Sequence, residues 1–325
     1  MAKAPVAIVV HSRPHETALV IAAVRQYRPE KLYVIADGPR QDHFEDSDLC
    51  REVRALFDDL GWDCQVHRMF RRTNVGIRKS FTEGLGWVFS QEASAIILED
   101  DTVPDPSFFP FCEQLLGHYA EDEQVGMISG SRLVRDRAGR RPAFTFSRIP
   151  TAWGWATWAR TWQGVDWEMS WRNENELSTL KHISLNRKHF YYLKEVLFLL
   201  DTNAVDTWDY QFLLSSLTRK LYSVIPSVNL VENIGFGDSA SHTTRRPKGL
   251  HEKIGVEKAD LDIPRRVPLN RGFERTFISR ILPERRPERV WIRYFFARFV
   301  TVQIDNVYRG LVAKKSRKSE GMKNP

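Results

Sequence analysis

The chain has 325 residues, of which 42% are hydrophobic and 27% charged, with a formal net charge of +7. This composition predicts one large α/β domain, alone or with a smaller appendage, and excludes disorder over most of the length. The three cysteines (Cys50, Cys64 and Cys112) have no CxxC spacing, and no apolar run reaches the ~18 residues of a membrane span, so we expect a cytosolic protein without a disulfide framework, signal peptide or membrane span.

Short apolar runs alternate with helical patterns from residue 5 to residue 119. The expected strands are VAIVVH, KLYVIA, DCQVHRMF and SAIILED. The expected helices occupy residues 14–27, 46–60, 77–89 and 106–119. This alternation predicts a mostly parallel sheet with helices on both faces.

The pattern changes after Gly130. A basic loop and the tryptophan-dense segment TAWGWATWARTW lead to further expected elements, which are helices at 186–200 and 208–219, a strand at 221–226, loops at 229–244 and 245–287, and an aromatic, basic helix at 279–312. The predicted organisation is a domain at 1–245 with halves 1–130 and 131–245, an extension at 246–312 that ends in this helix, and a disordered tail at 313–325.

Most of the positive charge lies at the C-terminus, where residues 309–325 hold six Lys or Arg against one Glu. Such a tail suits an anionic membrane surface or nucleic acid, although a solvated tail is the commoner case. The preceding helix could lie on a membrane interface or dock on its own domain. Peripheral contact with the inner face of the membrane therefore stays open, and nothing in the sequence demands nucleic acid.

Polar side chains follow the expected strands at their carboxyl ends, where ligands bind in parallel sheets. The most acidic of these groups is the triplet Glu99-Asp100-Asp101. Three adjacent carboxylates repel one another unless a cation neutralises them, and Mg²⁺ or Mn²⁺ with carboxylate and phosphate ligands is the natural partner. A solvated acidic turn is the alternative, and the position at the end of a very apolar strand favours the metal.

Asp209 stands at the start of an expected helix, directly after Trp208. A carboxylate at a helix N-terminus is favoured by the helix dipole, so capping is its ordinary role. If it faces a bound sugar instead, it can take a proton from an acceptor hydroxyl.

Seven segments in order resemble bacterial GT-A-fold glycosyltransferases, relatives of the family 2 transferases, with a layout similar to N-acetylglucosaminyltransferases that carry an EDD triplet. They are VAIVVHSRP, VIADGPR, RRTNVGIRKSFTEGLGWVF, IILEDDTVPDPSFFPFCEQLL, PTAWGWATWARTW, TWDYQF and NLVENIGFGDSASHT. The resemblance covers residues 5–245, and ILEDD and WGWATW are its most specific parts. It implies a GT-A fold and a nucleotide-sugar donor.

The resemblance also implies roles for single residues in binding the donor. Asp101 would bind a Mn²⁺ or Mg²⁺ ion that bridges the donor diphosphate, with Glu99 and Asp100 on the ribose or sugar. Asp37 would bind the base and Arg13 the base or diphosphate. Three more candidate donor contacts lie beside expected strand ends or a helix start that favours anions, and they are His11, Asn74 and Lys79.

The remaining assignments concern the acceptor and the metal. Asp209 matches the general base of inverting members, although relatives usually carry Glu-Asp where this chain has Trp208-Asp209. Trp153, Trp155 and Trp208 could stack on acceptor sugars, or belong to the core. His242 could complete the metal shell, or be an ordinary loop histidine.

The expected function is therefore a metal-dependent, inverting glycosyltransferase of polysaccharide biosynthesis that acts on a glycan or lipid-linked acceptor. One alternative is a sugar nucleotidyltransferase, which typically has a glycine-rich loop after its first strand, whereas HSRPHE contains no glycine. The other alternative is a non-catalytic protein that binds nucleic acid or membrane through its basic tail.

Overall fold

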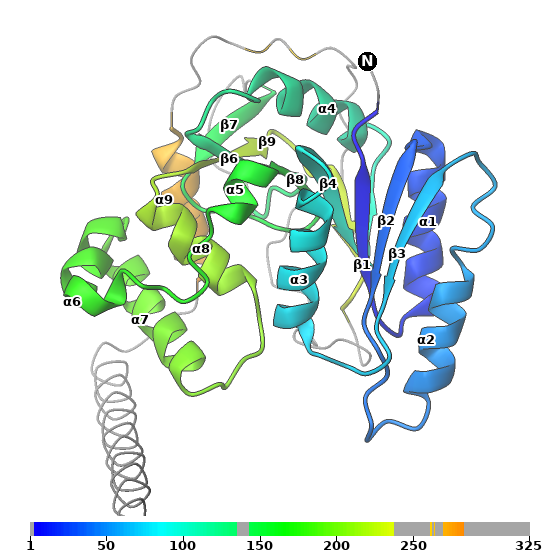
Figure 1. The fold of residues 1–325 in the computed structure, drawn as a ribbon. Helices are drawn as coiled ribbons and strands as arrows, with labels where there is room; N and C mark the ends of the chain where they lie inside the picture. Colours follow the sequence, from blue (N-terminus) through cyan, green and yellow to red (C-terminus); the bar gives the residue numbers. More distant parts are fainter. Residues whose placement is uncertain (1–2, 135–142, 237–260, 262, 264–268, 283–325) are drawn as a thin grey trace, which may run out of the picture. The chain divides into compact units, whose positions relative to one another are not determined.

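The computed structural model describes residues 3–134, 143–236, 261, 263 and 269–282. Within them, an eight-stranded sheet has the order β3-β2-β1-β4-β8-β6-β9-β7 (Figure 1). A separate two-stranded ribbon pairs β10 with β5. The strands are β1 (Val6–Val10), β2 (Lys31–Ala36), β3 (Gln65–Phe70), β4 (Ser94–Glu99), β5 (Thr102–Pro104), β6 (Val125–Ser129), β7 (Phe144–Ser147), β8 (Trp155–Trp158), β9 (Tyr222–Pro226) and β10 (Val231–Asn233). The helices are α1 (Pro14–Tyr27), α2 (Asp46–Ala55), α3 (Ile77–Phe89), α4 (Phe108–His118), α5 (Ala159–Gln163), α6 (Arg172–Ile183), α7 (Arg187–Asp201), α8 (Asp209–Thr218) and α9 (Arg271–Arg280).

The first half of the sheet is parallel, as predicted. β1 pairs in parallel with β2 and β4, and β2 pairs in parallel with β3. All five residues of β1 are buried, which explains its unbroken apolar run, because a strand covered on both faces has no polar positions. The carboxyl ends of these four strands therefore meet along one edge of the sheet.

The second half mixes strand directions. β8 lies between β4 and β6 and is antiparallel to both, β6 and β9 are parallel, and β7 is antiparallel to β9. The tryptophan-dense segment thus supplies an interior strand, and all four residues of β8 are buried. The chain is an α/β protein with a mostly parallel, mixed sheet flanked by helices.

Each face of the sheet has its own hydrophobic core. Val6, Ile8 and Val10 of β1 pack in one core with buried residues of α1, α2 and α4. Ala7 and Val9 pack in the other with residues of α3, α5 and α8. The alternation along β1 follows from the two-residue period of a strand. The face with Ala7 and Val9 is the one against which α8, the helix that begins at Asp209, packs.

The chain divides into two compact units, each described here separately. The first contains Met1–Asn175 and Thr207–Ile281, and the second contains Glu176–Asp206 and Leu282. The division coincides with a non-helical residue in α6, Asn175, with φ −155° and ψ 71°. The predicted boundary at 245/246 lies outside the described residues, as do the predicted helix beyond Leu282 and the tail. None of the helices in the described ranges is long and apolar enough to cross a membrane.

Helix α9 corrects the prediction of a continuous loop at 245–287. The Asn270 side chain accepts a hydrogen bond from the Phe273 N–H at 2.8 Å, which caps the helix. Phe273, Phe277 and Ile278 are buried on one face. The surrounding arginines and prolines concealed this short amphipathic pattern. Helix α2 also ends at Ala55, earlier than the predicted Leu60.

Candidate active site

The acidic triplet lies where the central strand β4 ends. Glu99 is the last residue of β4, and its N–H donates to the Thr102 hydroxyl at 2.8 Å. That hydroxyl donates back to the Glu99 carbonyl at 3.2 Å and closes a tight turn. The turn carries Asp100 and Asp101 out of the sheet before β5 begins.

Residues after β1 reach the triplet because β1 is the direct neighbour of β4. Arg13 Nη1 lies 2.7 Å from Asp101 Oδ2 and 3.3 Å from Asp100 Oδ1. The His11 backbone N–H donates to Asp100 Oδ2 at 3.3 Å. The structure therefore brings together Arg13, His11 and the triplet, all of which were predicted to lie at the donor site.

All three carboxyls of the triplet have raised pKa values, with burial as the largest cause. Burial, followed by repulsion from Asp101, raises the pKa of Asp100 to about 7. Burial likewise raises the pKa of Asp101, against the influence of Arg13, and holds the pKa of Glu99 well above its usual range. A carboxyl pKa raised in this way means that the ionised form is disfavoured until positive charge arrives.

These residues fit a hard divalent cation through their chemistry. The triplet side chains offer only oxygen ligands, and a bound cation would stabilise their ionised forms, which burial and mutual repulsion disfavour. Within the described ranges, no group of three or more His, Cys, Asp or Glu side chains is arranged so that it could hold a metal ion. Mg²⁺ sites in nucleotide-using enzymes commonly have one or two carboxylates and take the other ligands from water and phosphate.

Gly235 lies directly against Asp101, the candidate metal ligand. The sequence alone did not predict this contact. One residue beyond the pairing of β10 with β5, the Ile234 N–H donates a hydrogen bond to the Asp101 carbonyl oxygen at 2.9 Å. A Cβ atom at Gly235 would lie 1.9 Å from Asp101 Oδ2, so a side chain there would displace the carboxylate. The glycine-rich segment after residue 229 was the only signal.

Asp209 is the first residue of helix α8. The preceding Trp208 stacks on Phe81 with ring centroids 4.6 Å apart and on Trp155 at 5.3 Å, which anchors the start of α8. The charge of Asp209 contributes to the raised pKa of Glu99, after burial and the other two triplet carboxylates. Asp209 is exposed, and its carboxylate accepts a hydrogen bond from the Thr207 hydroxyl.

The predicted acceptor tryptophans occupy different environments. Trp155 has no exposed area and Trp208 only 3%, so in this conformation neither can stack on an acceptor. Both support the site from within the core instead. Trp153 is half-buried, with its ring centroid 5.6 Å from that of Phe236, and remains a candidate.

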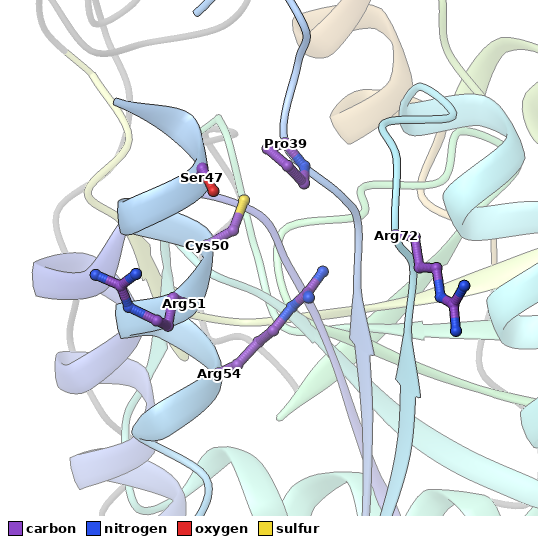
Figure 2. A pocket seen from close by; sticks show the side chains of 6 residues that line it. All are labelled: Pro39, Ser47, Cys50, Arg51, Arg54 and Arg72. Atoms are coloured by element: carbon purple, nitrogen blue, oxygen red, sulfur yellow. The ribbon is translucent and has the colours of Figure 1, made fainter. Parts of the chain in front are cut away.

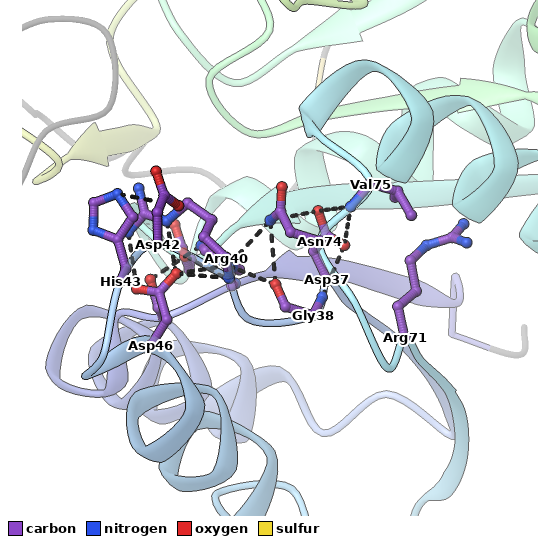
Figure 3. Close-up of polar contacts among 12 residues, drawn as sticks. Asp37, Gly38, Arg40, Asp42, His43, Asp46, Arg71, Asn74 and Val75 are labelled. Atoms are coloured by element: carbon purple, nitrogen blue, oxygen red, sulfur yellow. Dashed lines mark hydrogen bonds and ion pairs between the residues drawn. The ribbon is translucent and has the colours of Figure 1, made fainter.

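Asp37 and Asn74 form a network between the loops after β2 and β3 (Figure 3). Asp37 Oδ1 accepts from the Gly38 N–H at 2.8 Å and the Val75 N–H at 3.1 Å, while Oδ2 accepts from Asn74 Nδ2 at 3.1 Å. Gly38 O and His11 Nε2 are 2.9 Å apart. Asp37 thus already binds three protein donors, so its first role is to join the loops, and a base would have to use its remaining lone pairs.

One predicted donor residue, Lys79, is not brought to the triplet, and one predicted metal ligand cannot be placed. Lys79 is exposed and pairs with Glu83 of its own helix at 3.6 Å, as a solvated helix residue does. His242 lies outside the described residues.

No protein-family model matches the chain, and no curated protein matches its sequence. Solved structures resemble it distantly. The mannosyltransferase PcManGT from Pyrobaculum calidifontis, in complex with GDP-Man and Mn²⁺, is 10% identical over 67% of this chain and 70% of that chain, with a TM-score of 0.33. A 4-diphosphocytidyl-2C-methyl-D-erythritol synthase from Anaerococcus prevotii is 11% identical over 49% and 72%, with a TM-score of 0.30. The UTP-bound UGPase of Acinetobacter baumannii is 10% identical over 51% and 78%, with a TM-score of 0.31. Likenesses this distant do not choose between reactions.

Proposed function

We propose that the chain is a metal-dependent glycosyltransferase that moves a sugar from a nucleoside-diphosphate donor to a hydroxyl group of a glycan or lipid-linked acceptor. One observation carries the proposal: a largely buried acidic triplet at the end of β4 pairs with Arg13, and the charge of Asp209 acts on its first carboxyl, Glu99. This reaction requires carboxylates that bind a cation, a side chain that binds an anion, and an exposed carboxylate that accepts a proton.

The donor would be held by the triplet and by Arg13. Asp101 would bind Mn²⁺ or Mg²⁺ together with the donor diphosphate, and the cation would supply charge neutralisation for the departing nucleoside diphosphate. Arg13 now pairs with Asp100 and Asp101, and its planar guanidinium is equally suited to phosphate oxygens. Glu99 and Asp100 would contact the ribose or sugar.

Asp209 would act as the general base. Its carboxylate accepts the proton of the acceptor hydroxyl while that oxygen bonds to the anomeric carbon and the bond from this carbon to the diphosphate oxygen breaks. A single displacement of this kind inverts the configuration. The position at the N-terminus of α8 favours the ionised carboxylate that a base requires.

Product analysis tests the proposal against its nearest alternative. The full chain is incubated with a panel of nucleoside-diphosphate sugars and Mn²⁺, and separately with nucleoside triphosphates and sugar 1-phosphates. A glycosyltransferase releases nucleoside diphosphate from the first set. Pyrophosphate released from the second set, with no cleavage of the first, would make the protein a nucleotidyltransferase.

A further inference from the structure

Arg54, in the last turn of helix α2, extends its guanidinium to the ends of two neighbouring strands (Figure 2). Its Nη2 donates to the Asp37 carbonyl oxygen at 3.0 Å and to the Arg71 carbonyl oxygen at 2.6 Å. Asp37 is the first residue after β2, and Arg71 is the first residue after β3. Since the Arg71 N–H still donates to the Ala36 carbonyl at 3.0 Å, Arg54 binds where the pairing of the two strands ends.

The loops that follow these strands touch each other. A Cβ atom at Gly38 would lie 2.3 Å from the carbonyl carbon of Thr73, so the backbones meet at a distance that only glycine permits. The Asp37 carboxylate joins the same loops, because it accepts from the Gly38 and Val75 N–H groups (Figure 3). Arg54 joins them through carbonyl oxygens instead, so it holds the loops by a different set of atoms.

The guanidinium of Arg54 is held at a cost to stability. Its Nε is buried and has no hydrogen-bond partner within the described part of the chain. Its charge lies 5.2 Å from the centroid of the Phe70 ring, a favourable but weak contact. A buried donor without a partner lowers stability, and local costs of this kind are typical of functional sites. The arrangement therefore indicates a role for Arg54 beyond stability.

The loops that Arg54 holds carry Asp37 and Asn74, which were predicted to contact the donor. Asn74 Nδ2 donates to Asp37 Oδ2 at 3.1 Å and to the Gly38 carbonyl at 3.2 Å. Both partners are acceptors, which identifies Nδ2 as the amide nitrogen. Asn74 Oδ1 has no partner among the described residues and is not buried, and Figure 3 shows it pointing away from Gly38. This oxygen can therefore accept a hydrogen bond from a nucleobase.

We propose that Arg54 is a positioning residue for the nucleobase of the donor, and that it fixes the Asp37 carboxylate and the Asn74 amide through the backbones of their loops. The inference rests on the proposed function, in which these two side chains contact the donor. Hydrogen bonds to a base require an N···O distance of about 2.7–3.2 Å, so a loop that shifts by about 1 Å loses its discrimination between bases. The diphosphate would be held elsewhere, by the triplet and Arg13.

Isothermal titration of the full chain tests this role, with ADP, CDP, GDP, UDP and dTDP as separate probes in the presence of Mn²⁺. Arg54→Gln removes the guanidinium, and Arg54→Lys is a milder variant that keeps the charge on a shorter side chain. Arg51→Gln is the matched control, because Arg51 lies on the same helix, is exposed and pairs with the exposed Asp48 at 2.9 Å. Hydrogen exchange in peptides that contain residues 37–40 and 71–75 measures the mobility of the loops, and circular dichroism verifies folding.

The parent should prefer one of the probes. Arg54→Gln should bind the preferred diphosphate at least about tenfold more weakly and the others with smaller losses, so that the preference narrows. Arg54→Lys should change in the same direction by less, and Arg51→Gln should behave as the parent does. Exchange in both loops should be faster in the two Arg54 variants and unchanged in Arg51→Gln.

Three outcomes would overturn this inference and leave the proposed function intact. They are an unchanged preference in both Arg54 variants, equal losses for every diphosphate, and a parent that binds all of the probes equally. An unchanged preference with faster exchange in the loops would show that Arg54 stabilises the loops without positioning the base. A parent that binds none of the probes would overturn the proposed function as well.

Discussion

The two halves of the sheet contribute different things to the candidate active site. The parallel half, β1 to β4, delivers charged side chains at its strand ends, among them Arg13 and the triplet. The mixed half delivers buried aromatic rings, since Trp155 of β8 supports Trp208, and the separate ribbon of β5 and β10 leads to Gly235, which lies against Asp101. Most of the charged side chains therefore come from the parallel half, whereas the rest of the chain contributes Asp209 and the buried support of the site. Damage to the charged side chains should cost activity, and damage to the buried support should cost stability or geometry.

The largest expected effect is that of Asp209→Asn, which keeps the shape of the side chain and removes its basicity. Transfer to the acceptor should fall by about 10²–10⁴-fold, the usual contribution of a general base. Nucleoside diphosphate binding, followed by thermal shift with Mn²⁺, should not change. Unaltered transfer would show that Asp209 only caps α8.

Trp155→Ala should instead destabilise the fold. Trp155 has no exposed area and packs against Trp162, Trp208 and Phe212. Removing a buried tryptophan costs about 3–5 kcal/mol, measurable as a lower urea midpoint. The half-buried Trp153 is the comparison, and Trp153→Ala should cost clearly less. Equal losses would mean that the aromatic stack is not the support of the site.

Gly235→Ala separates geometry from stability. The added Cβ would meet Asp101 Oδ2, so metal-dependent activity should fall by roughly 10²-fold, as a misplacement of about 1 Å can cause. The melting temperature should change little. Gly117→Ala is the matched control, since a Cβ there meets nothing within 4 Å. Activity that survives Gly235→Ala would show that Asp101 need not stay where it is.

The smallest expected effect is electrostatic and concerns Asp46. The Arg40 guanidinium lowers the pKa of Asp46 from 3.8 to about 2. A folded-state pKa below the unfolded value means that the pair stabilises the fold above about pH 4 and loses this contribution as the pH falls toward 2. Asp46→Asn should therefore lower the free energy of unfolding at pH 7 by on the order of 1 kcal/mol, and by much less at pH 2. Equal losses at both values would show that Arg40 does not hold the carboxylate.

The sequence predicts the parallel half well because its strands are short, apolar and separated by clear helical patterns. Helix α1 and helix α3 match their predicted ranges, and the triplet lies at the predicted strand end. In the mixed half, the expected strand at 221–226 corresponds to β9 and the expected helix at 208–219 to α8, but other strands there and in the ribbon of β5 and β10 escape prediction for physical reasons. β8 is buried on both faces and shows no alternation, and β5 and β10 have three residues each, too few for a pattern.

The candidate site, like the fold, can be predicted from the sequence only in part. Charged residues at strand ends can be read from sequence, because parallel topology alone brings them together. The contact of Gly235 with Asp101 and the three donors on Asp37 depend on tertiary approach between distant segments, which no local spacing encodes. The burial of Trp155 and Trp208 likewise becomes evident only when β8 and α8 are placed.

Donor cleavage as a function of Mn²⁺ concentration, in the full chain and in Asp101→Asn, is the most direct test of metal-dependent sugar transfer. Asp63→Asn, an exposed carboxylate in the segment before β3, is the matched control. We predict saturable, chelator-sensitive release of nucleoside diphosphate in the parent and in Asp63→Asn, and a loss of at least about 10²-fold in Asp101→Asn. Release that is indifferent to Mn²⁺, or that Asp101→Asn retains in full, would contradict it.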